Sequence, residues 1–324
     1  MSTPRDADRY GLVIGATVRS EGDPRQIAEL AATPFNGAVS PDGRRLAYWE
    51  ASQGGGRARV LRLFDTAAPA QERILLTLPA TETANVSTGG GVVWSSDGSG
   101  LLIGVSSIEP ASTAVPVGAD RPVYTALRDV DIASGAVREV ARLMASLPLR
   151  PVAWERRSHV AAAMGMGDGG YTGSYVLARE GVTPTATPMC CNIAPALGAP
   201  DASRALAVSL EPRALFIWPI ADPDQRTTMD AASGERVDRA IWRNAREIVV
   251  LTGGDAPGAM RLEVWSLDGR RRVVLLGARD LSGIRADGTA AIIDGEAIDF
   301  DTGVRSPIPG VTGPSGIVAT LLLR

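Results

Sequence analysis

The chain has 324 residues, of which 45% are hydrophobic and 21% charged, and its formal net charge is −3. This length suffices for a sizeable core, but it exceeds one ordinary compact domain unless the fold is a repeat or a barrel. The slight acidity argues against a protein that coats nucleic acid. None of the 33 basic residues is a lysine, which excludes a lysine Schiff base and a P-loop lysine.

No apolar run approaches the roughly 18 residues of a membrane span, and the polar first residues, MSTPRDADRYG, do not resemble a signal peptide. We therefore expect no membrane insertion and no nucleic-acid partner. The compartment stays open: cytoplasmic for the chain as given, or extracytoplasmic if a targeting segment was removed. The only cysteines, Cys190 and Cys191, are adjacent and do not form a disulfide framework.

The first predicted elements lie near the N-terminus. Residues 1–9 are expected to be a disordered tail, and residues 10–34 predict a strand, a turn and a second strand. The next stretch, AVSPDGRRLAYWEAS at 38–52, predicts a hairpin. Proline presets φ for the turn, aspartate bonds to turn amides, and glycine accepts the left-handed backbone.

This hairpin recurs along the chain. When the turns are aligned, one position is occupied by Val39, Trp94, Trp154, Gly198, Trp242 and Ile284, so successive copies lie 55, 60, 44, 44 and 42 residues apart. The five further copies cover residues 92–107, 151–164, 195–210, 239–253 and 282–294. Repetition at this period is typical of repeat architectures.

A second hairpin follows several of these copies. It places a strand before an Asp-centred turn, and it occupies residues 59–69, 126–140, 261–276 and 296–308. Each unit thus offers four strands, named a to d. Such a unit cannot bury its faces alone, and a ring of units solves this without long free edges. Units of about 40–45 residues with four strands predict the blades of an all-β propeller.

The stretches SPDGRRLAY and WSSDGSGLL resemble the repeat of TolB-type, WD40-like (PD40) β-propellers, and the resemblance covers roughly residues 35–310. It implies a propeller fold within a single domain of 1–324. It implies no single activity, because such propellers serve as protein-binding platforms, as periplasmic transport components and as gating domains of peptidases.

Six repeats are visible, and the two ends of the chain remain. We predict seven blades, the last closed by strands from 10–34 and from 311–324, with six blades as the alternative. The N-terminal piece is expected to supply strands c and d. Two segments in d-strand positions, PRQIAEL and VREVARLMASL, also have helix-like spacing.

Several motifs have an ordinary structural explanation. The tryptophans at the repeat position predict packing between blades. The only histidine, His159, is predicted in a turn, and no G-x-S-x-G is present, so the hydrolase half of a propeller peptidase is absent. GMGDGG at 165–170 lacks the helix that a dinucleotide site needs. DVDIASG at 129–135 and DFDTG at 299–303 predict turns rather than calcium loops.

The least routine stretch is MCCN at 189–192, whose cysteines could form a vicinal disulfide, hold a soft metal or remain thiols. It lies in a d–a connection. In a propeller the d–a and b–c connections emerge on one face, so the long segments 79–91, 108–122, 165–174 and 184–195 should gather there, over blades 2 to 4. Loops on rigid scaffolds often carry binding function.

Two hypotheses follow. The favoured one is a monomeric, non-enzymatic binding or scaffolding propeller that engages a protein, peptide or small ligand at the channel mouth, because no nucleophile, base or metal cluster is assembled in the sequence. The alternative is a propeller enzyme of the lyase, lactonase or glycosidase type that uses carboxylates around the channel. We expect no catalytic residues, metal or cofactor under the first. Its binding residues would be Glu50, Asn85, Glu109, Asp168, Tyr171, Cys190, Cys191 and Asn192.

Overall fold

The computed structural model describes the chain from residue 9 to residue 323 with gaps. The described ranges are 9–23, 25–51, 58–86, 91–107, 124–144, 148–166, 173–180, 182–189, 193–194, 196–209, 213–254, 260–311 and 317–323.

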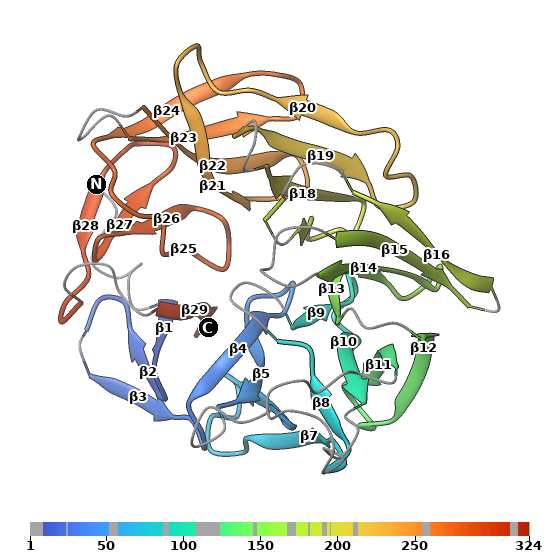
Figure 1. Cartoon of the computed structure of the whole chain (residues 1–324). Helices are drawn as coiled ribbons and strands as arrows, with labels where there is room; N and C mark the ends of the chain where they lie inside the picture. The colour runs from blue at the N-terminus through green and yellow to red at the C-terminus, as the bar shows by residue number, and fades with distance from the viewer. Residues whose placement is uncertain are drawn as a thin grey trace, which may run out of the picture.

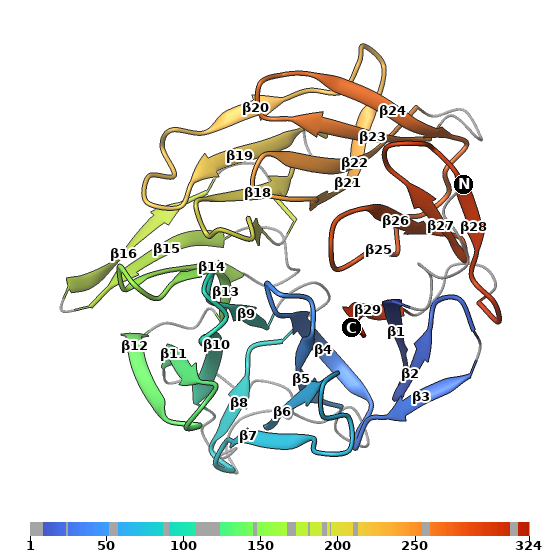
Figure 2. The ribbon, with the colours of Figure 1, turned by 180° about the vertical axis from the view of Figure 1, so that it is seen from behind.

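Seven small sheets stand around a central axis, as Figure 1 shows from one side and Figure 2 from the other. Each sheet is antiparallel, with its first strand at the axis and its last at the rim. The described ranges contain 29 strands and no α-helix. The predicted seven-bladed β-propeller is therefore confirmed.

The first three blades follow each other along the chain. Blade 1 contains β4 (Pro34–Val39), β5 (Arg45–Glu50), β6 (Val60–Asp65) and β7 (Arg73–Thr77). Blade 2 contains β8 (Glu82–Ala84), β9 (Val92–Trp94), β10 (Gly100–Ser107), β11 (Thr125–Asp131) and β12 (Val137–Leu143). Blade 3 contains β13 (Leu149–Glu155), β14 (Val160–Met166), β15 (Gly173–Arg179) and β16 (Val182–Pro188). In blade 2 the inner position is shared by β8 and β9, which both pair with β10.

The remaining blades complete the ring. Blade 4 contains β17 (Leu197–Gly198), β18 (Arg204–Val208), β19 (Leu215–Pro219) and β20 (Thr227–Met229). Blade 5 contains β21 (Arg236–Trp242), β22 (Glu247–Gly253), β23 (Arg261–Ser266) and β24 (Arg271–Leu276). Blade 6 contains β25 (Gly283–Ile284), β26 (Ala290–Ile293), β27 (Glu296–Asp299) and β28 (Arg305–Pro307). Blade 7 contains β29 (Ile317–Leu322), β1 (Tyr10–Ile14), β2 (Thr17–Ser20) and β3 (Gln26–Glu29).

The a–b turns form as the recurring letters predict. In blade 1 the Asp42 Oδ1 accepts the backbone N–H of Arg44, and Gly43 takes a φ of 75°. The same aspartate bond recurs at Asp97, Asp201 and Asp287. Side-chain caps and left-handed glycines therefore set the hairpin geometry.

The core consists of seven apolar clusters, one between each pair of neighbouring blades. Strand β22 illustrates the cause, because its side chains alternate between the two faces of the sheet. Ile248 and Val250 join the cluster with blade 4, whereas Val249 and Leu251 join the cluster with blade 6. Second strands are therefore apolar at successive positions, since both faces of a blade are buried.

The repeat tryptophans pack between blades, as predicted. Trp94 Nε1 donates to the carbonyl of Ala38 in blade 1 at 2.8 Å, and Trp242 Nε1 donates to Leu197 in blade 4 at 2.9 Å. Trp154 Nε1 donates to Asp129 Oδ1 in blade 2 at 3.0 Å.

Blade 7 joins the two ends of the chain. Strand β29 is its innermost strand and pairs antiparallel with β1, from Tyr10 opposite Leu322 to Ile14 opposite Ile317. The N-terminal segment supplies three strands, b, c and d, and not only the expected c and d. The expectation missed a strand because β1 and β2 are separated by only two residues, Gly15 and Ala16.

Within the two segments with helix-like spacing, the described residues contain strands β3 and β12, the outermost strands of blades 7 and 2. An outer strand has one solvated side, so its apolar pattern is weak and the hydrogen-bonded neighbour decides its conformation. No helix among the described residues is long and apolar enough to cross a membrane.

A polar clasp also joins blade 7 to blade 6. The Arg285 guanidinium binds the carboxylate of Glu21, whose side chain is only 2% exposed, and it lies 4.4 Å from the centre of the Tyr10 ring. The Tyr10 hydroxyl donates to Asp287 Oδ2 at 2.5 Å. Tyr10 of β1 and Glu21, which follows β2, thus connect blade 7 to Arg285 and Asp287 of blade 6.

We expect Glu21→Ala to lower the free energy of unfolding by about 3 kcal/mol, because it leaves a buried guanidinium without its carboxylate. Urea denaturation monitored by tryptophan fluorescence measures this. The control Glu139→Ala breaks the exposed pair with Arg142 and should cost no more than about 1 kcal/mol. Equal losses in the two variants would contradict the role of the clasp.

Candidate functional site

The loop-rich face of the propeller is the face with the d–a and b–c connections, and the opposite turn face carries the a–b and c–d turns. The long segments expected on the loop-rich face are partly strand. β14 continues to Met166, β15 begins at Gly173, and β16 continues to Pro188. Antiparallel pairing extends these strands because each finds a neighbour with free backbone groups.

Six of the eight predicted binding residues lie outside the described residues and stay predictions. They are Glu109, Asp168, Tyr171, Cys190, Cys191 and Asn192. The motif GMGDGG also lies largely outside the described ranges.

Glu50 ends strand β5 on the loop-rich face and is ion-paired. Its Oε2 accepts from Arg62 Nε at 2.9 Å, and the same guanidinium lies 3.7 Å from Glu72 Oε1. Two carboxylates therefore share one cation in blade 1.

Asn85 is buried between blades 2 and 3, with all its side-chain groups engaged. Its Nδ2 donates to Thr125 Oγ1 and to the Leu149 carbonyl, both at 3.1 Å, and its Oδ1 accepts from Ser106 at 2.7 Å. Near it, a Cβ on Gly104 would come 1.9 Å from the Leu149 oxygen, so the blades approach closely here. The structure gives Asn85 an inter-blade connecting role.

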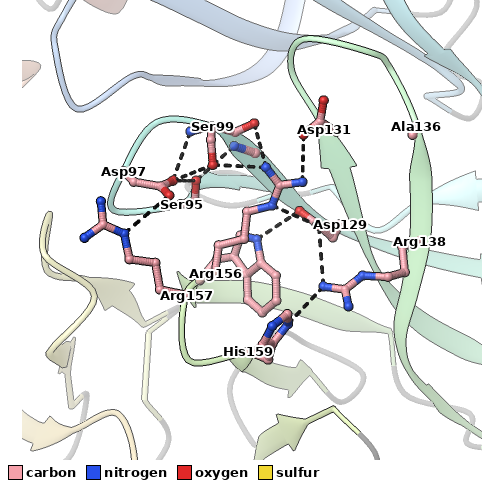
Figure 3. Close-up of polar contacts among 12 residues, drawn as sticks. Ser95, Asp97, Ser99, Asp129, Asp131, Ala136, Arg138, Arg156, Arg157 and His159 are labelled. Carbon is pink, nitrogen blue, oxygen red and sulfur yellow. Dashed lines mark hydrogen bonds and ion pairs between the residues drawn. The ribbon is translucent and has the colours of Figure 1, made fainter.

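His159, the only histidine, lies in the a–b turn of blade 3 with a φ of 55°, as predicted for a turn residue. Its Nδ1 is 2.7 Å from Glu180 Oε2 and 3.3 Å from Arg138 Nη2. Figure 3 shows it at the edge of a network of polar contacts, and its place in the a–b turn puts this network on the turn face.

At the centre of that network Arg156 joins blade 3 to blade 2 (Figure 3). Its Nε donates to Asp129 Oδ2 at 3.1 Å, its Nη2 to Asp131 Oδ2 at 2.8 Å and its Nη1 to the Ser99 carbonyl at 3.0 Å. Asp131 Oδ1 also accepts the backbone N–H of Ser134 at 2.9 Å. The stretch that resembles a calcium-loop fragment is therefore a capped turn that receives an arginine, as predicted for a turn.

An unpredicted group of charged residues lies on the loop-rich face at blade 5. Asp238 is on the innermost strand, β21, and its Oδ1 accepts from Arg236 Nε at 2.9 Å and from Arg213 Nη1 of blade 4 at 3.2 Å. Its Oδ2 is buried and has no hydrogen-bond partner among the described residues. A buried carboxylate oxygen without a partner is rare in folded proteins and calls for an explanation.

Further charged side chains of blade 5 and its connections form ion pairs with one another. Arg239 Nη1 lies 3.4 Å from Asp280 Oδ1 in the d–a connection that follows blade 5. The Arg261 guanidinium binds both Glu235 and Glu263. We call Arg213, Glu235, Arg236, Asp238, Arg239 and Asp280 the blade-5 charged cluster. The sequence ERVDRAIW at 235–242 signals this cluster. Four of its first five residues are charged, at the start of an innermost strand, whereas the innermost strands of the other blades are mostly apolar.

Glu263 differs from Asp238 because its oxygens are all used. Its Oε1 accepts from Thr252 and from Arg261, both at 3.0 Å, and its Oε2 accepts from Trp265 Nε1 at 2.6 Å. The oxygens of Glu82 in blade 2 are similarly occupied by hydrogen bonds from Arg128 and Tyr124. These bonds, chiefly those from Arg128, lower the pKa of Glu82. Of these three carboxylates, Asp238 is the one that keeps an oxygen free of partners within the described part of the chain.

A cavity of about 430 Å³ lies on the axis, toward the turn face. Innermost strands from six blades line it. No group of three or more His, Cys, Asp or Glu suited to a metal ion occurs in the ranges the structure describes.

Comparison of structures places the chain among β-propeller proteins. It resembles an oligogalacturonate lyase in complex with manganese, with 17% identity and a TM-score of 0.58 over 95% of this chain and 88% of that one. It also resembles an acylaminoacyl peptidase of Pyrococcus horikoshii, with 14% identity and a TM-score of 0.59 over 87% of this chain and 46% of that one. A puromycin-hydrolyzing peptidase of Mycobacterium tuberculosis matches with 15% identity and a TM-score of 0.57 over 94% of this chain and 55% of that one. The chain thus spans about half the length of these peptidases.

No protein-family model matches the chain, and no curated protein matches it. At these identities the likeness to solved structures establishes the seven-bladed propeller fold.

The comparisons correct the favoured hypothesis of a non-enzymatic scaffold and the expectation that the protein is not an enzyme. The structures it resembles are mostly enzymes, a lyase and several peptidases, and they support the enzyme alternative. The expectation relied on the lack of a nucleophile, histidine or cysteine cluster in the sequence. A search for local motifs does not detect a site whose residues come from separate blades.

We expect Asn85→Ala to lower the free energy of unfolding by about 2 kcal/mol, because it leaves buried partners in two blades without hydrogen bonds. Thermal and urea denaturation measure this. Gln225→Ala, on an exposed turn of blade 4, should change stability by no more than about 0.5 kcal/mol. Unchanged stability of the Asn85 variant would show that Asn85 does not connect the blades.

The network on the turn face predicts acid sensitivity. Burial of Asp97 opposes its ionisation, but hydrogen bonds from Ser95 and Ser99 outweigh this and lower its pKa to about 2. The stabilisation is therefore complete above the unfolded pKa near 4 and is lost as the pH falls toward 2. We expect the urea midpoint to fall across this window, and less steeply in Asp97→Asn. An equally steep fall of the urea midpoint with pH in wild type and in Asp97→Asn would contradict the role given to Asp97. The control is Asp224→Asn, the same change on an exposed turn, in which the midpoint should fall as in wild type.

Proposed function

We propose that the protein is a propeller enzyme that cleaves an acidic oligosaccharide on its loop-rich face, with Asp238 as the group that takes the proton. The resemblance to oligogalacturonate lyase supports this choice among enzyme classes, because that match covers most of both chains. The proposed reaction uses groups that the propeller itself carries.

One observation carries the proposal: Asp238 has one oxygen held in place and the other free. Arg236 and Arg213 fix Oδ1, so the carboxylate has a defined orientation. The free Oδ2 is buried and unpartnered among the described residues. Of the two oxygens, Oδ2 is therefore the one left to accept a proton from a substrate.

The surrounding cations suit a substrate with a carboxylate. In an elimination, the base removes the proton α to the substrate carboxylate, a C=C bond forms, and the C–O bond to the leaving sugar breaks, with the leaving oxygen taking a proton from solvent water. Negative charge develops on the substrate carboxylate in this step. Arginines next to Asp238, such as Arg213 and Arg239, would stabilise it electrostatically.

The oligogalacturonate lyase that this chain resembles is in complex with manganese. The described residues of this chain do not offer a cluster of three metal ligands, and the whole chain has one histidine. They do not fit such an ion, so the proposed step relies on the carboxylate and the arginines alone.

A second candidate is the propeller of a longer peptidase-like protein. Its support is that most of this chain aligns with only about half of each peptidase chain. A peptidase partner domain or chain would then supply the nucleophile that this sequence lacks. Membership of the TolB-type repeat family is likewise a proposal, supported by SPDGRRLAY and WSSDGSGLL.

We expect the purified protein to produce ultraviolet absorbance from the new conjugated double bond when incubated with oligogalacturonates, with and without Mn²⁺. Asp238→Asn should lower kcat by about 100-fold or more, since the amide cannot take the proton. Its circular dichroism should match wild type.

The matched control is Asp268→Asn, the same change on an exposed turn of the same blade but on the turn face, which should retain full activity. Full activity of the Asp238 variant would contradict its role. A wild-type protein that is inactive on acidic oligosaccharides would contradict the proposed function itself.

A further inference from the structure

The axial cavity is separate from the blade-5 charged cluster, since none of that cluster's residues is among the described residues that line it. It lies toward the turn face, where the a–b turns converge on the axis. Its volume of about 430 Å³ falls in the range of small-molecule sites. The residues that line it include Trp94 and Trp242, Ser282 and Thr320, and Arg243 and Arg285.

Two neighbouring residues of blade 6 show that this space is open to a ligand. The Ser282 hydroxyl oxygen is buried and has no partner among the described residues. At Gly283 a Cβ would meet no atom within 4 Å, and the φ of this glycine is ordinary. At Gly198, by contrast, a Cβ would lie 2.2 Å from the Val152 carbonyl oxygen. Gly283 therefore leaves space in the cavity rather than allowing blades to approach.

The backbone around the axis adds hydrogen-bonding groups. An innermost strand has no further strand on its axial side, so alternate N–H and C=O groups point at the channel. The Ile284 carbonyl is one of these, and it accepts from Thr320 Oγ1 at 2.6 Å. A ring of such groups, interrupted by indoles, suits a small molecule with many hydroxyls and an apolar ring face.

The charges that line the cavity are positive. Arg243 and Arg285 belong to the lining, and no aspartate or glutamate of the described ranges does. Their carboxylate partners are not among the residues that line the cavity: Arg243 pairs with Glu247 and Asp301, and Arg285 pairs with Glu21. An anionic group is therefore favoured over a cationic one at this end of the channel.

We propose that the axial cavity binds one monosaccharide-sized sugar acid, with Ser282 donating to it. The choice of a uronic acid as the probe rests on the proposed function, whereas the site itself rests on the cavity and its lining. The cavity is a binding site distinct from the proposed catalytic centre.

The experiment is isothermal titration of the wild-type protein with D-galacturonate, D-galactose and D-galactosamine, alongside three variants. We expect galacturonate to bind most tightly and galactosamine least. Gly283→Leu should weaken galacturonate binding at least ten-fold, because the side chain occupies the cavity. Ser282→Ala should weaken it several-fold while keeping or raising the melting temperature, because it removes a buried hydroxyl that has no partner in the described part of the chain.

Ala133→Leu, on an exposed turn of blade 2, is the matched control for added volume and should bind as wild type. The proposal is overturned if no sugar acid binds, if galactosamine binds as well as galacturonate, or if both cavity variants bind normally. A loss of melting temperature in Ser282→Ala would show that this hydroxyl has a structural partner, which would also overturn its assignment to the ligand. Lyase activity of Asp238 and sugar binding in the cavity are measured separately, so one can fail without the other.

Discussion

Every blade of this propeller has two apolar faces, and this constraint organises the molecule. A four-stranded sheet with both faces apolar needs a neighbour on each side, and only a closed ring supplies two neighbours to every blade. Seven inter-blade clusters account for the core. Ring closure depends on the pairing of β29 with β1, which brings residues from both chain ends into one sheet.

Arginine makes many of the polar connections between blades on the turn face. Arg156 reaches from blade 3 to blade 2, and Arg45 Nη2 reaches from blade 1 to the Gly98 carbonyl of blade 2 at 3.1 Å. Arg243 Nε reaches from blade 5 to the Gly288 carbonyl of blade 6 at 2.9 Å. The guanidinium suits this task, because its fixed fork of donors can satisfy a carbonyl and a carboxylate together. Side chains therefore connect neighbouring blades on the turn face.

Asp238 and Glu263 show how far two carboxylates of one blade can differ in the occupation of their oxygens. Glu263 has its oxygens occupied by a hydroxyl, a guanidinium and an indole, so it can only stabilise the fold. Asp238 is held on one side and open on the other. A search for nucleophiles and histidines passes over such a group, because its chemistry comes from its partners and not from its residue type. The expectation of a non-enzymatic scaffold drew on local motifs, and the enzymes among the structures that this chain resembles contradict it.

The sequence by itself determined the architecture, because the pattern that builds a blade is local. Asp-Gly turns between apolar strands repeat at positions such as Asp42 and Asp287, and short-range turn chemistry makes them hairpins wherever they occur. It could also place the tryptophans between blades and His159 in a turn. Only the tertiary structure decided that the N-terminus supplies three strands, that Asn85 connects two blades, and that Asp238 keeps an oxygen unpartnered among the described residues. These features depend on contacts between residues far apart in the chain, such as Arg213 with Asp238, and no local pattern encodes which atoms a closed ring leaves free.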